Sequence, residues 1–487
     1  MTNQNYNFTI LALAGALVSG ALAQELPTIG TIDSRLGKLE IKNGFPTDET
    51  VKRLYDDIDF QRACQAYIWA LPYMAMTEWQ RWTREEFGAG NLGYVDYLDF
   101  KDKLGILTAN ATTPYAHAFP NLAETGPLVF EFPAAPIAGG IGDFWQRPIS
   151  DTGQTGPDKG KGGKYLILGP GQPDMNPEGY FVFRSPTTNI WSGQRGLDAD
   201  PAKAKAALQG MKIYPYAQRD NPPPTKHVRP NKPWLAVQPR GLKYWEGLAK
   251  TIDSEPAIER DRVILAMLVP LGIEKGKPFN PDERQRKILI DAANVGELMA
   301  RCIGYAKRFP GSVVWPGRKW EYSLFLTEVN QEKPNYTQLD ERSSWFYEAV
   351  GVTVGMMGRT VGAGQVYLES QKDSIGTWLD GGKTYKLTVP KDAPVAQFWS
   401  FTVYDNESRC LIDTGSYPDR SSRDDITKNA DGSVDLYFGP EAPTGKPPKN
   451  WIKTLPNKGW FTYFRLYGPT QPYFDKTWVL PDIEEVK

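Results

Sequence analysis

Histidine and cysteine are scarce in this sequence of 487 residues, which contains two histidines, His117 and His227, and three cysteines. Zinc sites are usually built from several of these side chains, so the composition nearly excludes them. We expect no cofactor, and any bound metal should be a hard cation held by carboxylate oxygens. The cysteines permit one disulfide and one free thiol, although buried free thiols are the simpler interpretation of Cys64 and Cys302.

Two common catalytic motifs are missing from the sequence, and a third is incomplete. There is no G-x-S-x-G nucleophile elbow and no H-E-x-x-H zinc motif. The glycine-rich run 156–165 resembles a phosphate-binding loop, but Asp158 and Tyr165 stand where that motif requires glycine and Ser or Thr. We interpret it as a turn between strands in which Lys164 contacts an anionic part of a substrate.

No excess of charge of either sign is present, since 56 Lys and Arg face 57 Asp and Glu for a net charge of −1. This balance argues against a nucleic-acid partner. The apolar run 8–23 is too short to span a membrane and fits a signal peptide covering residues 1–23, although its leading residues carry no Lys or Arg. We expect an exported protein, secreted or periplasmic, without integral membrane association; a buried N-terminal helix is the alternative.

Glycosylation is a further expectation if the host is a eukaryote. Beyond the predicted signal peptide, three acceptor sequons begin at Asn110, Asn335 and Asn406. Such short motifs arise often by chance. They therefore mark where glycans could attach and are weak evidence that the protein is glycosylated.

The hydrophobic pattern predicts an α+β multidomain fold with two β-rich, sandwich-like domains and an intervening helical region. Short Val-, Phe- and Tyr-containing runs separated by Gly and Pro indicate strands and turns, whereas apolar residues at spacings of three and four indicate helices. The predicted parts are a leader at 24–55, a β-rich domain with a leading helix at 56–195, a helical region at 196–349 and a second β-rich domain at 350–487.

Two helices and one hairpin stand out. The spacing of apolar residues predicts a helix over Asp59–Phe87, which Pro72 should kink or split. A second helix should begin at a cap provided by Asn280 and end near Phe309. The Asp-Gly pair at 431–432 predicts a tight hairpin whose second strand begins near residue 434.

The richest cluster of candidate catalytic residues is Asp143, Arg147 and Asp151. Either carboxyl group is suited to acid/base catalysis, while Arg147 is suited to holding an anionic group. Trp145 lies within the cluster and is a candidate for substrate binding. The structural alternative is an ion-pair network that fixes a long loop.

A second candidate cluster extends from Asn110 to His117. An imidazole general base in this chain has to be His117 or His227, and the hydroxyl of Tyr115 and the amide of Asn110 are close to the first of these in sequence. We therefore predict catalytic roles for His117 and Tyr115 and a substrate-binding role for Asn110. A hydrogen-bonded structural histidine is the alternative for His117.

Aromatic and polar groups also meet near the end of the predicted strand at 394–404. Trp399 and Tyr404 are candidates for substrate binding. The alternative is an Asx turn that closes the strand.

These motifs resemble the family that pairs the domains of unknown function numbered 1254 and 1214. The resemblance extends from about Asp59 to Val486, and Thr112 stands where the family commonly has an acidic residue. It implies a multidomain architecture rich in β-sandwiches, with an inserted helical region, and no established reaction. The motifs that carry it include AYIWALPYMAM, ANATTPYAHAF, GPLVFEFP, FWSFTVYD, NADGSVDLYFGP and NKGWFTYFRLYGPTQPYF.

These observations favour an exported enzyme that works without a cofactor, a hydrolase or acid/base catalyst for a small organic or carbohydrate-like molecule. The alternative is an exported protein that binds a ligand or glycan without turning it over, using its many aromatic residues for stacking. The sequence leaves the oligomeric state open.

Overall fold

A computed structural model describes residues 30–486 of the chain. The expected signal peptide at 1–23 and the start of the leader lie outside the described residues. The described part divides at Ile58 into two compact units, residues 30–58 and residues 59–486. Each unit is described by itself.

The first unit is a small antiparallel sheet followed by the beginning of a long helix. Arg35 pairs with Asp57 at 2.6 Å within this unit. The helix begins at Asp48, inside the predicted leader, because Thr47 and the acidic first turn favour helix initiation upstream of the predicted start. The elements are β1 (Thr31–Ser34), β2 (Gly37–Lys42), β3 (Phe45–Pro46) and α1 (Asp48–Arg81).

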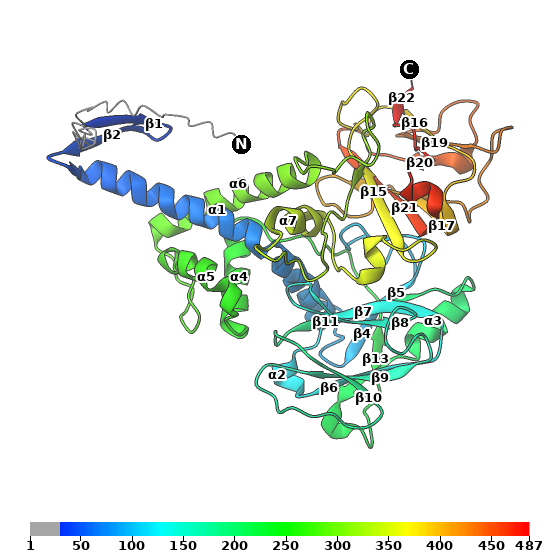
Figure 1. Cartoon of the computed structure of the whole chain (residues 1–487), viewed down its shortest axis with the longest axis horizontal. Helices are drawn as coiled ribbons and strands as arrows, with labels where there is room; N and C mark the ends of the chain where they lie inside the picture. Colours follow the sequence, from blue (N-terminus) through cyan, green and yellow to red (C-terminus); the bar gives the residue numbers. More distant parts are fainter. Residues whose placement is uncertain (1–29, 487) are drawn as a thin grey trace, which may run out of the picture. The chain divides into compact units, whose positions relative to one another are not determined.

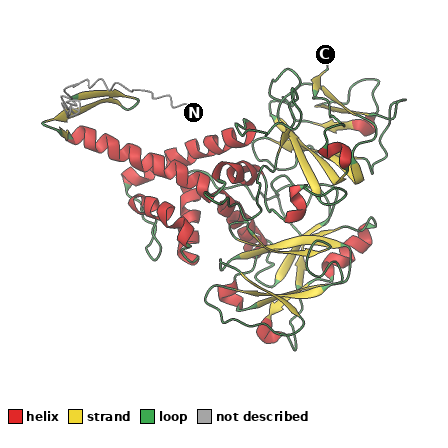
Figure 2. Ribbon diagram, in the orientation of Figure 1, coloured by secondary structure: helices red, strands yellow, loops and turns green. Residues whose placement is uncertain are grey.

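The first β-rich part is a sandwich of two sheets (Figures 1 and 2). The six-stranded sheet has the order β13-β4-β5-β11-β7-β8, and the four-stranded sheet has the order β10-β9-β6-β12. Strands β12 and β13 follow residue 195 in the chain and complete the two sheets. The strands are β4 (Gly93–Tyr97), β5 (Tyr115–Ala118), β6 (Leu128–Phe132), β7 (Ile137–Asp143), β8 (Pro148–Gly153), β9 (Gly163–Leu168), β10 (Tyr180–Arg184), β11 (Ile190–Gly196), β12 (Lys212–Pro215) and β13 (Lys226–Val228).

The second β-rich part is also a sandwich of two sheets. The larger sheet has the order β14-β15-β21-β17-β18, and the smaller has the order β20-β19-β16-β22. The long strand predicted at 394–404 is β17, which has a neighbour on each side. The strands are β14 (Glu321–Tyr322), β15 (Gln365–Ser370), β16 (Tyr385–Val389), β17 (Val395–Asp405), β18 (Asp419–Ser421), β19 (Val434–Gly439), β20 (Trp451–Lys453), β21 (Trp460–Pro469) and β22 (Glu484–Glu485).

The predicted hairpin at Asp431-Gly432 is wrong in its pairing, although the turn is present. Gly432 has a φ of +88°, and the turn is closed by a hydrogen bond from its N–H to the carbonyl of Asn429. Strand β19 follows the turn but pairs with β16 and β20. The residues before the turn form no strand, so the local turn signal did not determine the long-range partner.

Helices lie mainly between the two sandwiches in sequence. The fold class, α+β with a helical region between β-rich parts, is confirmed. No helix within residues 30–486 is long and apolar enough to cross a membrane. Beyond α1 the helices are α2 (Leu122–Thr125), α3 (Pro201–Gln209), α4 (Leu242–Ser254), α5 (Arg262–Leu268), α6 (Glu283–Tyr305), α7 (Leu339–Glu348) and α8 (Gln471–Phe474).

Pro72 does not split α1, which is helical on both sides of it. Proline has no N–H to offer the carbonyl of residue i−4, here Ile68. The hydroxyl of Ser343 on α7 lies 3.5 Å from this carbonyl oxygen, and the guanidinium of Arg342 donates to the next one, Trp69, at 2.6 Å. The Ser343 proton is donated to the Leu339 carbonyl at 2.5 Å, so Arg342 is the donor that the neighbouring helix provides beside Pro72.

Helix α6 confirms a helix in the predicted region with shorter bounds. Its cap is Asp282 and not Asn280: the Asp282 carboxylate accepts from the N–H of Gln285 at 2.7 Å, and the Gln285 side chain accepts from the N–H of Asp282. The helix ends at Tyr305, before the predicted Phe309. The sequence signal pointed to the right turn but to the wrong one of two capping side chains.

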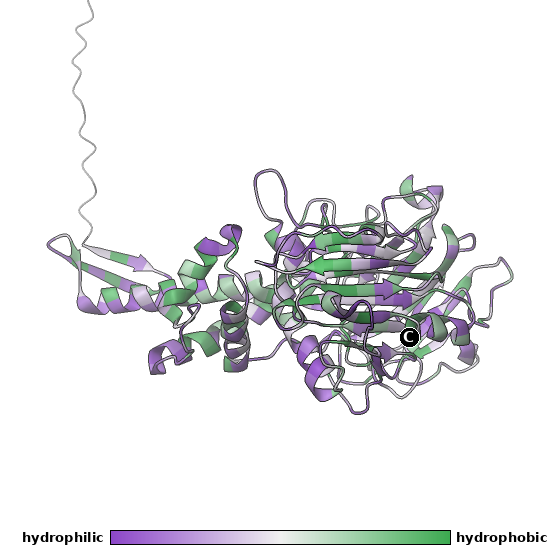
Figure 3. Cartoon of the chain, turned by 90° about the horizontal axis from the view of Figure 1, so that it is seen from below, coloured by the Kyte–Doolittle hydropathy of each residue, from purple (hydrophilic) through white to green (hydrophobic). Residues whose placement is uncertain are grey.

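Alternation along the strands separates core residues from those on the opposite face of each sheet. On β21, Phe464 and Leu466 belong to the core of the second sandwich. Tyr463, Arg465 and Tyr467 therefore point to the opposite face. Figure 3 shows hydrophobic residues along the strands and mostly hydrophilic residues in the connecting loops. Strand β21 thus has one face for the core of its sandwich and an opposite face with two tyrosines and an arginine.

Capping of α6 provides a direct test of these assignments. Replacing the capping side chain with Asp282→Ala should lower the free energy of unfolding by about 1 kcal/mol, because the N–H of Gln285 loses its acceptor. The matched change Asn280→Ala should alter it by less than about 0.5 kcal/mol, since that exposed side chain caps nothing. Urea unfolding followed by circular dichroism measures both, and a larger loss for Asn280→Ala would contradict the structure.

Candidate functional site

A cavity of about 400 Å³ lies where the outer faces of the two sandwiches meet. This volume is within the range of small-molecule binding sites. The first sandwich contributes strands β5, β7 and β11, and the second contributes β15, β17 and β21. The segment after α7, including Gly351 and Met356, closes the cavity from a third side.

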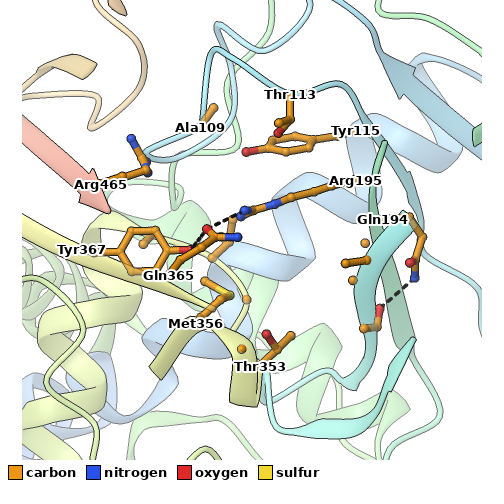
Figure 4. Close-up of a pocket in the computed structure, with 18 of the residues that line it drawn as sticks. Ala109, Thr113, Tyr115, Gln194, Arg195, Thr353, Met356, Gln365, Tyr367 and Arg465 are labelled. Carbon is orange, nitrogen blue, oxygen red and sulfur yellow. Dashed lines mark hydrogen bonds between the residues drawn. The ribbon is translucent and has the colours of Figure 1, made fainter. Parts of the chain in front are cut away.

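Arg195 and Arg465 reach this cavity from opposite sandwiches. Arg195 extends from β11, and its Nη1 donates to Oε1 of Gln365 on β15 at 2.8 Å (Figure 4). Its guanidinium carbon lies 5.3 Å from the centre of the Tyr115 ring. The Tyr367 hydroxyl donates to the same Gln365 oxygen at 2.7 Å, which fixes the amide orientation. Arg195 is therefore held across the cavity by neutral groups.

Arg465 is 2% exposed and is also surrounded by neutral acceptors. Its Nη1 donates to the Thr402 hydroxyl at 2.8 Å, and its Nη2 donates to the Tyr404 hydroxyl at 2.6 Å and to the Thr108 carbonyl at 3.0 Å. Among residues 30–486, no carboxylate oxygen lies within 4.0 Å of either Arg465 or Arg195. Arg195 and Arg465 are therefore two of the positive groups in the cavity lining, which also includes Arg423, and neither of the two has an ion-pair partner among the described residues.

Arg465 is linked to one acidic group, Asp419, through Thr402. The Thr402 hydroxyl accepts from Arg465 and donates to Asp419. Burial raises the pKa of the Asp419 carboxyl to about 7, against the opposing effects of Thr402 and Arg465. Near neutral pH this carboxyl is therefore only partly ionised and cancels only part of the arginine charge.

Lys103 lies behind Tyr115, with its ammonium nitrogen 4.9 Å from the ring centre. It donates to the carbonyl oxygens of Asn110, Ala111 and Thr113, the last at 2.6 Å. Burial, with a contribution from the charge of Arg195, lowers the pKa of Lys103 to about 7. The three hydrogen bonds of this lysine thus stabilise the turn that precedes β5.

His117 is on the cavity wall, two residues along β5 from Tyr115. It is 9% exposed, and its Nδ1 has no hydrogen-bond partner within the described part of the chain. The rings of Trp79 and Trp191 lie 4.5 and 6.3 Å from it, centre to centre. Burial, together with the charge of Arg195, lowers the pKa of His117 to about 3. Its imidazole is therefore neutral at physiological pH.

The Asp143, Arg147 and Asp151 cluster does not line this cavity. Arg147 pairs with Glu332 at 2.5 Å, and its own backbone N–H donates to the Asp143 carboxylate at 2.9 Å. Burial raises the pKa values of both Asp143 and Asp151 to about 6. Of the five predicted catalytic residues, the structure brings only His117 and Tyr115 to the cavity.

The predicted substrate-binding residues are dispersed. Trp145 packs against Trp69 at 4.7 Å beside a separate cavity of about 40 Å³. Trp399 belongs to the core of the second sandwich, and Lys164 lies on β9 with its ammonium 5.7 Å from the Tyr180 ring centre. None of these three contacts the larger cavity.

The other two predicted substrate-binding residues support the cavity from behind. The buried side-chain amide of Asn110 donates to the Tyr467 hydroxyl, and its Oδ1 accepts from the N–H of Thr112 at 2.6 Å. The Tyr404 hydroxyl accepts from Arg465 and donates to the carbonyl of Ala109 at 2.8 Å. These residues position cavity groups without lining the cavity themselves.

Sequence reasoning missed both arginines. One signal was available for Arg465: it is the only charged residue in β21, WFTYFRLYGP, where its neighbours are mostly aromatic or apolar. A charged group inside such a strand needs a polar environment on its own face of the sheet. Arg195 is likewise the only charged residue of its strand, β11, but it lies next to the strand's end among glycine and glutamine, so the signal there is weaker.

The protonation of His117 can be measured because the chain has only two histidines. We expect His117 to stay neutral at pH 5, while His227 is protonated there, since its hydrogen bond to Asp96 and that group's charge outweigh burial and raise the pKa of His227. The low pKa of His117 means that its contribution to stability is present above about pH 6.5 and is lost as the pH falls toward 3. Imidazole ¹⁵N NMR, assigned with His227→Gln, tests this; a His117 midpoint near 6.5 would contradict it.

Comparisons with known proteins agree with the two-part architecture. A model described as a protein of unknown function, DUF1254, matches residues 91–215, and one described likewise as DUF1214 matches residues 364–471. No curated protein matches the chain. Arg195 falls in the first matched segment and Arg465 in the second, so each domain supplies one of these two arginines to the cavity.

Two solved structures of bacterial proteins are similar. The VPA0106 protein from Vibrio parahaemolyticus is 17% identical, with a TM-score of 0.52 over 88% of this chain and 100% of that one. An uncharacterised protein from Burkholderia cenocepacia is 13% identical, with a TM-score of 0.43 over 90% of this chain and 97% of that one. The first shows a shared fold. Both domain models match in order along one chain, so the protein contains a segment of each of the domains of unknown function 1254 and 1214.

Proposed function

We propose that the protein binds a small organic anion in the cavity between its two sandwiches. The observation that carries this proposal is the pair of guanidinium groups, Arg195 and Arg465, that face the cavity without a carboxylate partner among the described residues. Guanidinium groups bind carboxylates and phosphates by charge-assisted hydrogen bonds. A carboxylate or phosphate between them would supply the missing negative charge.

Size and shape support a small ligand. About 400 Å³ accommodates a molecule of modest size and not a long polymer. Apolar groups such as Trp79, Trp345 and Phe398 line the cavity beside the arginines. The ligand should therefore combine one acidic group with an apolar body. Of the two ligand classes expected from the sequence, this favours a small organic molecule over a carbohydrate-like one.

Catalysis is a second candidate function, favoured by the free Nδ1 of His117. The charge of Arg195 contributes to the low pKa of this imidazole. An anion bound at Arg195 would offset that charge and make His117 a stronger base. The protein would then act as a cofactor-independent acid/base catalyst, with His117 accepting a proton from the bound molecule and Tyr115 beside it.

Export belongs to the same proposal, because the apolar run 8–23 is typical of a signal peptide. In that case the mature protein begins near Gln24. N-terminal sequencing of the protein recovered from its native host tests this, and a cytosolic protein that retains its first residues would contradict it.

Anion binding can be tested by calorimetric titration with acetate, benzoate and phenyl phosphate. We expect benzoate or phenyl phosphate to bind, and Arg195→Gln to weaken binding by about tenfold to a hundredfold, which corresponds to the loss of one charge-assisted contact. Arg184→Gln is the matched control, since Arg184 on β10 pairs with Asp174 and lies outside the cavity lining.

The buried Arg465 requires a second variant that retains folding. Arg465→Lys keeps the charge but removes the forked donor, so it should weaken binding less than Arg465→Gln. NMR spectra of the protein mixed with each anion, recorded over several hours, would show whether any product forms and so test the catalytic alternative. Failure of all three anions to bind, or equal binding by Arg195→Gln and Arg184→Gln, would refute the proposal.

A further inference from the structure

We infer that the ligand of this cavity is a planar aromatic acid with a hydroxyl or carbonyl group on the side of the ring opposite the acid. This inference rests on the proposed anion site and specifies the rest of the molecule. It follows from three features of the cavity: a second polar anchor, the separation of that anchor from the arginine, and the aromatic walls between them.

His117 is the second polar anchor. Its unpaired Nδ1 is buried on the cavity wall, where an unmatched polar atom costs free energy. Because the imidazole is neutral, this nitrogen either donates or accepts one hydrogen bond, depending on the tautomer. A hydroxyl group can satisfy it in both cases, and a carbonyl group can satisfy it when the nitrogen carries the proton.

The strand register fixes how far apart the two anchors begin. Tyr115 on β5 pairs with Arg195 on β11, and His117 pairs with Gly193. The two anchors therefore start two strand positions apart, about 7 Å. The Arg195 guanidinium and the His117 ring both lie beside the Tyr115 ring, 5.3 and 5.6 Å from its centre. A benzoic acid with a substituent across the ring is suited to span these two groups, whereas an acid of two or three carbons is shorter.

Glycine at 193 makes this arrangement possible. A Cβ atom there would lie 2.7 Å from Cε1 of His117 and 2.3 Å from the Trp191 ring. Any larger residue would therefore displace the two rings that border the cavity at this point. The absence of a side chain keeps His117 and Trp191 in place.

The walls next to His117 are rigid aromatic surfaces. The indole N–H of Trp79 donates to the Tyr97 hydroxyl at 2.8 Å, which fixes that ring. Trp191 packs closely on glycine backbone at positions 142, 193 and 351. On β7, the neighbouring stretch Ala138–Gly140 lines the cavity with almost no side-chain volume. Fixed indoles facing a flat backbone surface favour a flat aromatic ring over a bulky aliphatic one.

Matched acids separate these requirements. By calorimetry we expect 4-hydroxybenzoate to bind about fivefold or more tighter than benzoate, from one added hydrogen bond in a buried site. Benzoate should in turn bind tighter than cyclohexanecarboxylate, which has the same acid on a non-planar ring. His117→Phe should abolish the preference for 4-hydroxybenzoate over benzoate, whereas His227→Gln, which changes the other histidine, should retain it.

The results distinguish an error in the inferred ligand class from an error in the proposed anion site. Equal binding of 4-hydroxybenzoate and benzoate, or a preference that survives His117→Phe, overturns the inferred ligand class while anion binding stands. Cyclohexanecarboxylate binding as well as benzoate overturns the planar ring. If no acid binds and Arg195→Gln changes nothing, the proposed function itself fails.

Discussion

Burial of positive charge without a carboxylate partner is the constraint on which the candidate site depends. A guanidinium transferred from water into a protein interior needs hydrogen-bond acceptors and a nearby negative charge. Arg465 obtains acceptors from Thr108, Thr402 and Tyr404, all neutral, and Arg195 obtains one from Gln365. These dipoles reduce the cost of burial and leave both charges available, so an anion that enters the cavity completes an arrangement already organised for it.

The two-sandwich architecture explains why such a site lies between domains. In each sandwich, the sheet that borders the cavity packs one face against its own core. The opposite face, on β5 and β11 in the first sandwich and on β15 and β21 in the second, carries aromatic and arginine side chains. A third cluster of buried residues joins these faces to α1, α4, α6 and α7. Because each sandwich supplies one of Arg195 and Arg465, neither domain contains the anion site by itself.

Local patterns predicted much of the fold because strand and helix periodicity are local properties. The two β-rich parts, the helical region and α6 follow from them, while strand partners and the exact cap do not, as the turn at Gly432 and the cap at Asp282 show. The site was less predictable. Arg147 seemed paired with its neighbours Asp143 and Asp151, yet its side chain pairs with Glu332 from a distant segment. His117 was identified because the chain has so few histidines; Arg195 and Arg465 meet only through tertiary packing.

The most direct test of the central claim is a crystal structure of the protein soaked with 3-bromo-4-hydroxybenzoate, with the bromine located by anomalous scattering. The account predicts a bromine peak in the cavity beside His117 and Trp191, with the carboxylate between Arg195 and Arg465. A fully occupied peak outside the cavity, or an empty cavity at saturating concentration, would contradict it.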